Sequence, residues 1–314
     1  MRFASVTGPV ASAEVTLADA HAHAWIDPPA GVESGPRLTD EDAIVRDLAA
    51  LAAAGGSLLV DCQPGGCGRD ANRLAAISQR SGLHITATTG FHRRDYYPAD
   101  HWLWNCGPER AAAYFITELV QGMLESTSGA RATTIKVGHE GHLSGRTGVL
   151  AEAAAAACRA TGALILIHTE RGLGVEELLP FFADRGVPAG RLYLCHMDKR
   201  PDLGLHAELA EAGVLLGYDT FLRPKYQPER HALPLLCSMI ERGHDRSIAV
   251  GLDLAEASLW PSLGSGPGPA YLATELVPRL RRDGVPEEAL TRVSGGNIAR
   301  RLVPTRPASG EDQA

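Results

Sequence analysis

The sequence has little positive charge, no long apolar run and few cysteines. It carries 30 Lys and Arg against 37 Asp and Glu, a formal net charge of -7, so it lacks the basic surface that a general nucleic-acid binder needs. No apolar run approaches the roughly 20 residues that cross a membrane. The six cysteines are scattered over 314 residues, and the first residues show no basic segment followed by an apolar core. We therefore expect a cytoplasmic protein with neither a nucleic-acid nor a membrane partner.

What the sequence does contain is a regular alternation of short β-like runs with longer, Ala- and Leu-rich helical stretches. Hydrophobic residues make up 45% of the chain and the mean hydropathy is -0.07, as in globular proteins with a sizeable core. Strands are predicted at 17–21, 57–62, 84–89, 133–137, 164–168, 192–196, 214–218 and 247–253, and helices at 40–54, 108–125, 149–160 and 174–185. This alternation predicts an α/β fold, a single (β/α)8 TIM barrel.

The pattern runs without a linker, so we predict one barrel domain over residues 17–303. Residues 1–16, which include "FASVTGPVASAEV", are predicted to form a short N-terminal β-hairpin that packs on the bottom of the barrel. Residues 304–314 are polar and rich in Pro and Gly, which predicts a flexible tail.

Side chains that can bind metal stand where five of the predicted strands end. In a TIM barrel the chemistry sits at the C-terminal ends of the strands. Residues two apart on a strand face the same way, so both histidines of "HAH" can point into the barrel mouth. A lone histidine there is more often a hydrogen-bonded core residue, but four histidines with one carboxylate suit zinc and similar metals. The predicted ligands are His21, His23, Lys136, His168, His196 and Asp253.

Lys136 is the unusual member of this set, because a charged ammonium has no lone pair for a metal. Burial and nearby cations can strip a lysine of its proton. The neutral amine can then react with carbon dioxide to form a carbamate, an anion able to bridge two metals. The alternative is a structural lysine that pairs with a rim carboxylate.

These motifs, together with others along the chain, resemble the phosphotriesterase-related family of the amidohydrolase superfamily. The resemblance runs from "VTGPVASAEVTLADAHAH" through "TTGFHRRDYYP", "IKVG", "IHTERG", "CHMDK" and "GLDLA" to "GGNIARRL". It implies a binuclear metal centre bridged by carboxylated Lys136 and a hydroxide, with zinc expected and manganese or cobalt as alternatives. The commoner family motif is His-Glu-His. Ala22 replaces the middle residue here, and we expect it to point away from the barrel mouth.

The resemblance also implies a role for each ligand. His21, His23 and Asp253 would hold the more buried metal, and His168 and His196 the more exposed one. The two metals would acidify the bridging water and polarise the substrate. Asp253 is the predicted catalytic residue, which passes the proton of that water to the leaving oxygen. Homodimers are usual in such proteins, but no self-complementary patch can be read from the sequence.

Other cysteines and histidines near these motifs are predicted to have no role in catalysis or metal binding. Strand alternation would turn Cys195 away from the mouth, which makes it a packing residue. Cys62 and Cys67 lack a partner pair with zinc-finger spacing. His139 and His142 follow the fourth strand, and solvation at the rim is the expected role for both.

The loops at the barrel mouth carry many cations for an acidic protein, and some of them are expected to bind an anionic group of the substrate. The "CHMDK" and "RPKY" elements resemble the lactonase branch of the family. We therefore predict a lactonase that opens a sugar lactone or a phosphorylated sugar lactone. The predicted substrate-binding residues are His92, Tyr97, Lys199, Tyr218, Arg223 and Lys225.

Several alternatives remain open at this stage. A phosphotriesterase, a phosphodiesterase, an esterase or an amidase would use the same centre. A mononuclear deaminase would share the histidines and the aspartate but would not need Lys136. A non-enzymatic barrel with a vestigial site would be expected to have lost a ligand, and none is lost here.

Overall fold

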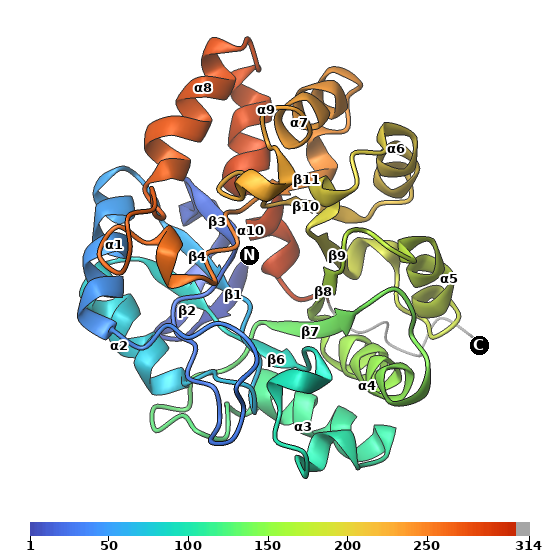
Figure 1. Ribbon diagram of the computed structural model, residues 1–314. Coiled ribbons are helices and arrows are strands. Elements are labelled where there is room, and N and C mark those ends of the chain that lie inside the picture. The colour runs from blue at the N-terminus through green and yellow to red at the C-terminus, as the bar shows by residue number, and fades with distance from the viewer. Residues whose placement is uncertain (306–314) are drawn as a thin grey trace.

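The strands form an inner ring that is surrounded by helices (Figure 1). The structure, a computed structural model, describes residues 1–305. The barrel strands are β3 (Ala18–Ala22), β4 (Leu58–Asp61), β5 (His84–Thr86), β6 (Thr88–Gly90), β7 (Thr134–His139), β8 (Leu164–Thr169), β9 (Leu192–Cys195), β10 (Leu215–Tyr218) and β11 (Ile248–Val250). β5 and β6 are two parts of the predicted third strand, and the carbonyl of Ala87 between them still accepts a hydrogen bond from Thr133 N at 2.8 Å. The predicted TIM barrel is therefore confirmed.

Neighbouring strands pair in parallel all the way from β3 to β11. The longest ladder joins β7 to β8, from Thr134 opposite Leu164 to His139 opposite Thr169. The ring closes beyond the end of β11, where Asp253 N donates to His21 O at 2.8 Å. Parallel pairing brings the C-terminal ends of all strands to one face of the barrel, as the sequence analysis assumed.

The helices begin and end at residues with a clear local reason. They are α1 (Glu41–Ala53), α2 (Ala71–Ser81), α3 (Pro108–Val120), α4 (Gly145–Thr161), α5 (Leu178–Ala183), α6 (Leu203–Glu211), α7 (Ala232–Glu241), α8 (Val277–Arg282), α9 (Glu287–Thr291) and α10 (Asn297–Leu302). The Asp40 side chain caps α1 by accepting from Ala43 N, and Gly162 ends α4 at a φ of 71°. The predicted helix 108–125 stops at Val120, before Gly122 with its φ of 150°.

The core has two layers. The layer inside the ring contains Ala18, Ala20, Leu58, Val60, Cys62, Leu164, Leu166, Tyr193, Cys195, Leu215 and Ala249. The larger layer lies between the strands and the helices. The N-terminal hairpin pairs β1 (Arg2–Ser5) with β2 (Gly8–Ala11), and its Phe3 and Val10 pack onto the inner layer. The hairpin therefore contacts the bottom of the barrel, as predicted.

The predicted tail, residues 304–314, lies outside the described residues from 306 onward. Within residues 1–305, no helix combines the length and the apolar character that crossing a membrane requires.

Candidate metal centre

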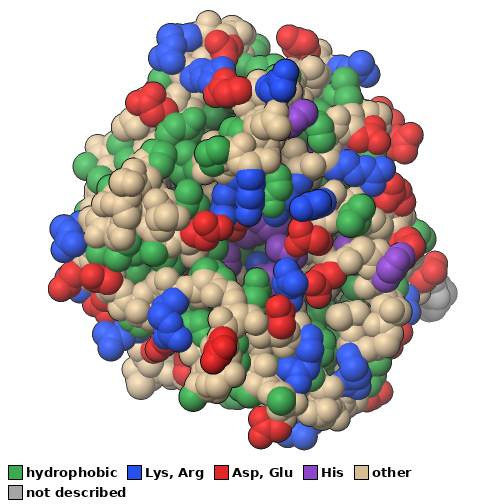
Figure 2. All heavy atoms as spheres, in the orientation of Figure 1, with side chains coloured by type: hydrophobic (Ala, Val, Ile, Leu, Met, Phe, Trp, Pro, Cys, Tyr) green, Lys and Arg blue, Asp and Glu red, His purple; other side chains and the backbone are tan. Residues whose placement is uncertain are grey.

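The six predicted ligands line one pocket of about 380 Å³ at the C-terminal ends of the strands. Figure 2 shows the pocket as a hollow with histidines at its base and side chains of both charges around it. The structure thus brings together His21, His23, Lys136, His168, His196 and Asp253. Their convergence is a structural fact, and their binding of metal remains a prediction.

A change of register in β3 aims its two histidines into the pocket. Ala18 and Ala20 both face the inner layer, and the register then shifts between Asp19 and Ala22. The shift turns Ala22 outward, as predicted, so His21 and His23 can line the pocket.

The buried Asp19 carboxylate supports this irregular segment. Its Oδ1 accepts hydrogen bonds from His21 N at 3.2 Å and from Leu252 N at 3.1 Å, which ties β3 to the segment after β11. Burial raises the pKa of Asp19 to about 8.

Two ligands lie just past their strands in left-handed backbone conformations. His196 has a φ of 61° and Asp253 a φ of 48°, and neither is a glycine. Such strained residues persist only where their surroundings hold them, and they concentrate at functional sites. The turn at His196 corrects the expectation for Cys195. Cys195 belongs to the inner layer, and its Sγ lies within 4.8 Å of potential ligand atoms of His21 and Asp219. Cys195 still packs in the core, but it does not point away from the barrel mouth.

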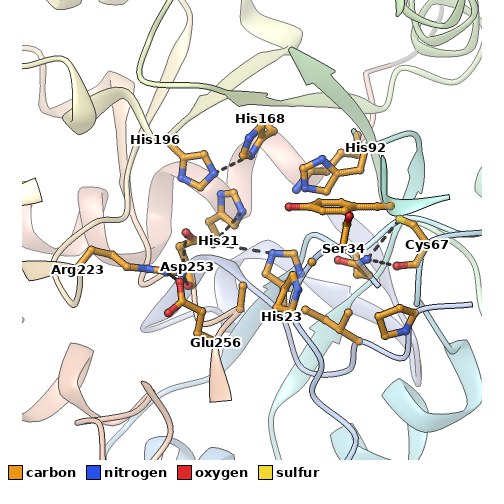
Figure 3. A pocket seen from close by; sticks show the side chains of 18 residues that line it. His21, His23, Ser34, Cys67, His92, His168, His196, Arg223, Asp253 and Glu256 are labelled. Carbon is orange, nitrogen blue, oxygen red and sulfur yellow. Dashed lines mark hydrogen bonds and ion pairs between the residues drawn. The ribbon is translucent and has the colours of Figure 1, made fainter. Parts of the chain in front are cut away.

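The ligand side chains form two adjacent groups (Figure 3). In the first group, Asp253 Oδ1 lies 3.9 Å from His21 Nε2 and 4.0 Å from His23 Nε2. In the second group, His168 Nδ1 lies 3.0 Å from His196 Nε2. The rings of His21 and His196 are 4.6 Å apart between centroids, so the two groups share one wall of the pocket.

One buried carboxylate that sequence analysis missed, Asp219, connects the two groups. Its Oδ1 accepts from His196 Nδ1 at 2.7 Å, and its Oδ2 lies 3.1 Å from His21 Nδ1. Burial acts to raise the pKa of Asp219, but the His196 and His21 imidazoles hold it well below its usual range. With its Nδ1 side directed to Asp219, His21 keeps an Nε2 atom that has no hydrogen-bond partner among the described residues, which leaves it free for a metal. His196 Nε2 is paired with His168 Nδ1, and a metal bound there would replace that hydrogen bond.

The backbone around Asp219 is fixed by a second buried carboxylate, that of Asp198. Asp198 Oδ2 accepts from the backbone N–H groups of Asp219 and Thr220, at 3.1 and 2.8 Å, and from the Thr220 hydroxyl at 2.7 Å. The sequence signal for Asp219 was its position directly after the seventh strand, in "LLGYD".

The state of the donor atoms fits divalent cations. Burial lowers the pKa of His23 and His196 well below the ordinary value and that of His168 to about 3, so these imidazoles are neutral. Among the described residues, no hydrogen-bond partner exists for Lys136 Nζ, His21 Nε2 or His168 Nε2, although all three atoms are buried. Buried polar atoms are normally paired, so this concentration of unpaired atoms points to a ligand.

The predicted substrate-binding residues separate into three kinds. His92 and Arg223 line the pocket. Lys199 and Lys225 lie outside its wall, with their Nζ atoms 5.1 and 5.2 Å from the Tyr226 ring.

Tyr97 and Tyr218 are buried elsewhere, which corrects their predicted role. Tyr97 Oη accepts from His92 N at 3.1 Å beneath the third loop, and its neighbour Tyr96 lines the pocket instead. Tyr218 belongs to the outer layer of the core, with Oη 2.6 Å from His206 Nδ1.

Two other histidines were expected at the rim. His139 is fully buried and its Nε2 lies 3.0 Å from Leu173 O, so it is a structural residue rather than a solvated one. His142 is exposed, as expected. Sequence analysis also missed several residues of the pocket wall. These are Ile26, Pro28, Ser34, Gly35, Pro36, Gln63, Cys67, Tyr96, Ala255 and Glu256.

The chain is similar to known proteins over most of its length. The model of the phosphotriesterase family matches residues 1–301. A phospho-furanose lactonase of Mycoplasmopsis synoviae is 26% identical over 284 residues, which cover 84% of this chain and 80% of that protein. A phosphotriesterase homology protein of Mycobacterium tuberculosis is 28% identical over 302 residues, 90% of this chain and 92% of its own. The crystal structure of a lactonase from Listeria monocytogenes superposes with a TM-score of 0.91 at 24% identity, covering 98% of this chain and 100% of that one.

Proposed function

The chain belongs to the phosphotriesterase family, and from that premise we propose that it is a binuclear metal-dependent lactonase acting on sugar lactones. The observation that carries the proposal is the convergence of the six ligand side chains, with several of their donor atoms buried and unpaired. The lactone preference is supported by the Mycoplasmopsis synoviae relative, which is a phospho-furanose lactonase. A phosphotriesterase, a phosphodiesterase or another ester hydrolase would use the same side chains.

Each group of side chains has its own part in holding the metals. His21, His23 and Asp253 would hold one cation, and His168 and His196 the other. When bound, two divalent cations supply Lewis acidity for the ester carbonyl and lower the pKa of water at the site. Lys136 would join the two groups as a carbamate. Its formation consumes one molecule of carbon dioxide and releases one proton, and it converts the buried amine into an anion.

Asp219 and Arg223 are the residues that fix the orientation of these side chains. Asp219 holds the Nδ1 sides of His196 and His21, at 2.7 and 3.1 Å. Arg223 Nη2 donates to Asp253 Oδ2 at 3.0 Å, while Oδ1 is the atom nearest His21 and His23. Because Arg223 holds one of its oxygens, the Asp253 carboxylate keeps a fixed orientation in which it can accept a proton and return it to the leaving alkoxide.

A phosphorylated sugar lactone is the second candidate substrate. The name of the Mycoplasmopsis synoviae relative favours it, as do Lys199 and Lys225, which both lie beside Tyr226. Arg223, the third cation among the predicted substrate-binding residues, is already paired with Asp253 and Glu256.

A panel of lactones and phosphoesters tests the function. Proton release would be used to measure turnover by protein that has been loaded with zinc or manganese. We expect hydrolysis of at least one sugar lactone with higher kcat/KM than any phosphotriester or phosphodiester. Turnover of phosphoesters but no lactone would refute the lactonase assignment and leave the metal centre standing.

The metal centre needs its own test. We expect two metals per chain, activity that rises with bicarbonate, and a carbamate signal in NMR spectra after incubation with isotopically labelled bicarbonate. Lys136→Ala should remove the carbamate signal and lower the metal content. One metal per chain, unaffected by Lys136→Ala, would exclude the bridging lysine.

A further inference from the structure

The part of the pocket wall that does not belong to the metal centre carries almost no net charge. Apolar side chains, including Ile26, Pro36 and Tyr96, form much of this wall, and Ser34 and Gln63 add neutral polar groups. Apart from the predicted ligands and His92, the titratable side chains that line the described pocket are Arg223, Glu256, the thiol of Cys67 and the phenol of Tyr96. Arg223 and Glu256 lie together beside Asp253, as Figure 3 shows.

The charge of Arg223 is already neutralised by protein groups. Nη2 donates to Asp253 Oδ2 at 3.0 Å, and Nη1 pairs with Glu256 Oε1. The Arg223 side chain is only 8% exposed, whereas that of Glu256 is 51% exposed. An incoming group therefore meets the Glu256 carboxylate more readily than the guanidinium behind it.

The hydrogen-bonding capacity left on this pair suits a hydroxyl group. Arg223 Nε is buried, and no residue within 1–305 accepts its N–H. The Glu256 carboxylate keeps acceptor capacity toward solvent, because it has two oxygens and only Oε1 pairs with Arg223. A substrate hydroxyl can donate to this exposed carboxylate. A phosphate dianion only accepts, so Glu256 would repel it.

We propose that the Arg223–Glu256 pair makes this pocket select hydroxyl-rich lactones that carry no phosphate, with Glu256 as the specificity-determining residue. The proposal rests on the proposed lactonase function and chooses between its two substrate classes. Lys199 and Lys225, the other two cations among the predicted substrate-binding residues, do not line the pocket, so neither is placed to pair directly with a group bound beside Glu256.

The kinetic test compares D-ribono-1,4-lactone with its 5-phosphate, using zinc-loaded wild-type protein and Glu256→Gln. The amide can still accept from Arg223 but carries no charge. We expect the wild type to prefer the unphosphorylated lactone, and Glu256→Gln to raise kcat/KM for the phosphate about tenfold, mostly through KM. With the unphosphorylated lactone the same variant should raise KM, because an amide oxygen is a weaker acceptor for a hydroxyl than a carboxylate, so the two substrates should respond in opposite directions.

Glu140→Gln is the matched control. Glu140 is also a rim carboxylate paired with an arginine, 2.9 Å from Arg93 Nε, but it does not line the pocket. An equal rise in kcat/KM for the phosphorylated lactone in both variants would show that the effect comes from general surface charge and would overturn the inference. A wild-type preference for the phosphorylated lactone, unchanged in Glu256→Gln, would overturn the inference while leaving the lactonase function intact.

Binding of ribitol and D-ribitol 5-phosphate separates the inference from the function, because neither polyol contains a lactone bond. Calorimetry should show weaker binding of the phosphate to the wild type and tighter binding of it to Glu256→Gln, by about tenfold. If no lactone is turned over but this binding pattern holds, the lactonase function fails and the charge selection stands. The absence of any difference between the two polyols, in either protein, would overturn the inference.

Discussion

Two buried polar regions of this barrel differ in how completely their hydrogen bonds are made. Around Arg69, which follows β4, every guanidinium nitrogen has a carboxylate or carbonyl partner. Both oxygens of Glu118 are used as well, one of them also by the Thr89 hydroxyl at 2.6 Å. At the barrel mouth, in contrast, Lys136 Nζ is fully buried and has no partner among the described residues.

This difference in hydrogen bonding indicates that the Arg69 region is structural and the barrel mouth functional. A cluster whose donors and acceptors are all paired needs nothing more, and it holds the β4 loop, α3 and β6 together. A region with unpaired buried atoms is destabilising unless something else satisfies them. The first region is therefore built for stability and the second for a ligand. Four experiments, taken from the largest expected effect to the smallest, test this distinction.

Asp253→Asn should have the largest effect, on turnover. The amide cannot take up the proton, so we expect kcat to fall by on the order of 10²–10⁴-fold, while the unfolding free energy of the metal-free protein stays near that of the wild type. Steady-state kinetics and urea unfolding measure the two. Asp283→Asn, at the exposed C-terminal end of α8, is the control, and retained turnover in Asp253→Asn would refute the proton-transfer role.

Replacing Arg69 and Lys136, the buried cation of each region, by methionine tests the difference between the two regions most directly. Arg69→Met leaves Glu118 buried without its counter-ion and should lower the unfolding free energy by about 3–5 kcal/mol. Lys136→Met removes an unpaired group, so the metal-free protein should lose little stability or gain some. Urea unfolding of both variants, with a chelator present, provides the measurement. Equal destabilisation of the two would show that the distinction is wrong.

Zinc should stabilise the protein through one region only. At a hundredfold excess over Kd, one bound metal adds about 2.7 kcal/mol to the unfolding free energy. We expect this gain for each of the two cations in the wild type and in Arg69→Met alike, and the loss of one of the two gains in His168→Asn. Thermal unfolding with and without zinc tests it, and an undiminished gain in His168→Asn would remove that histidine from the metal site.

His206 on α6 is a buried histidine whose two ring nitrogens both have partners, unlike those of His21 and His168 at the barrel mouth. Its replacement is expected to have the smallest effect. Its Nδ1 lies 2.6 Å from Tyr218 Oη and its Nε2 lies 2.9 Å from Arg200 O. Burial lowers the pKa of His206 from 6.5 to about 4. Between these two values the unfolded chain binds more protons than the folded one, so stability falls as the pH falls.

The expected contribution of His206 is a loss of about 2 kcal/mol from about pH 7.5 to about pH 5. His206→Gln should flatten the curve of unfolding free energy against pH by that amount, measured with a chelator present. The difference between the two curves isolates His206 from the other buried histidines. Parallel curves would contradict the assignment.

The sequence alone predicted the barrel and the six side chains that meet at its mouth. It could do so because strand alternation is periodic, and because parallel strands of a barrel end at one face. His168 and Lys136 were found in this way. Cys195 was misjudged because His196 takes a left-handed φ of 61°, and alternation does not apply across such a turn.

The rest of the site depended on tertiary structure. Asp219 contacts His21 only because their strands bring residues nearly 200 apart in sequence together, and the sequence does not record which side chains meet. Loops have no period, so nothing in "RDYYP" could tell that Tyr96 faces the pocket and Tyr97 the core. The sequence therefore determined which six side chains converge in the candidate metal centre, through regular strands. Only the tertiary structure decided the neighbours of those ligands and the charge of the substrate wall, because both depend on contacts between distant, irregular segments.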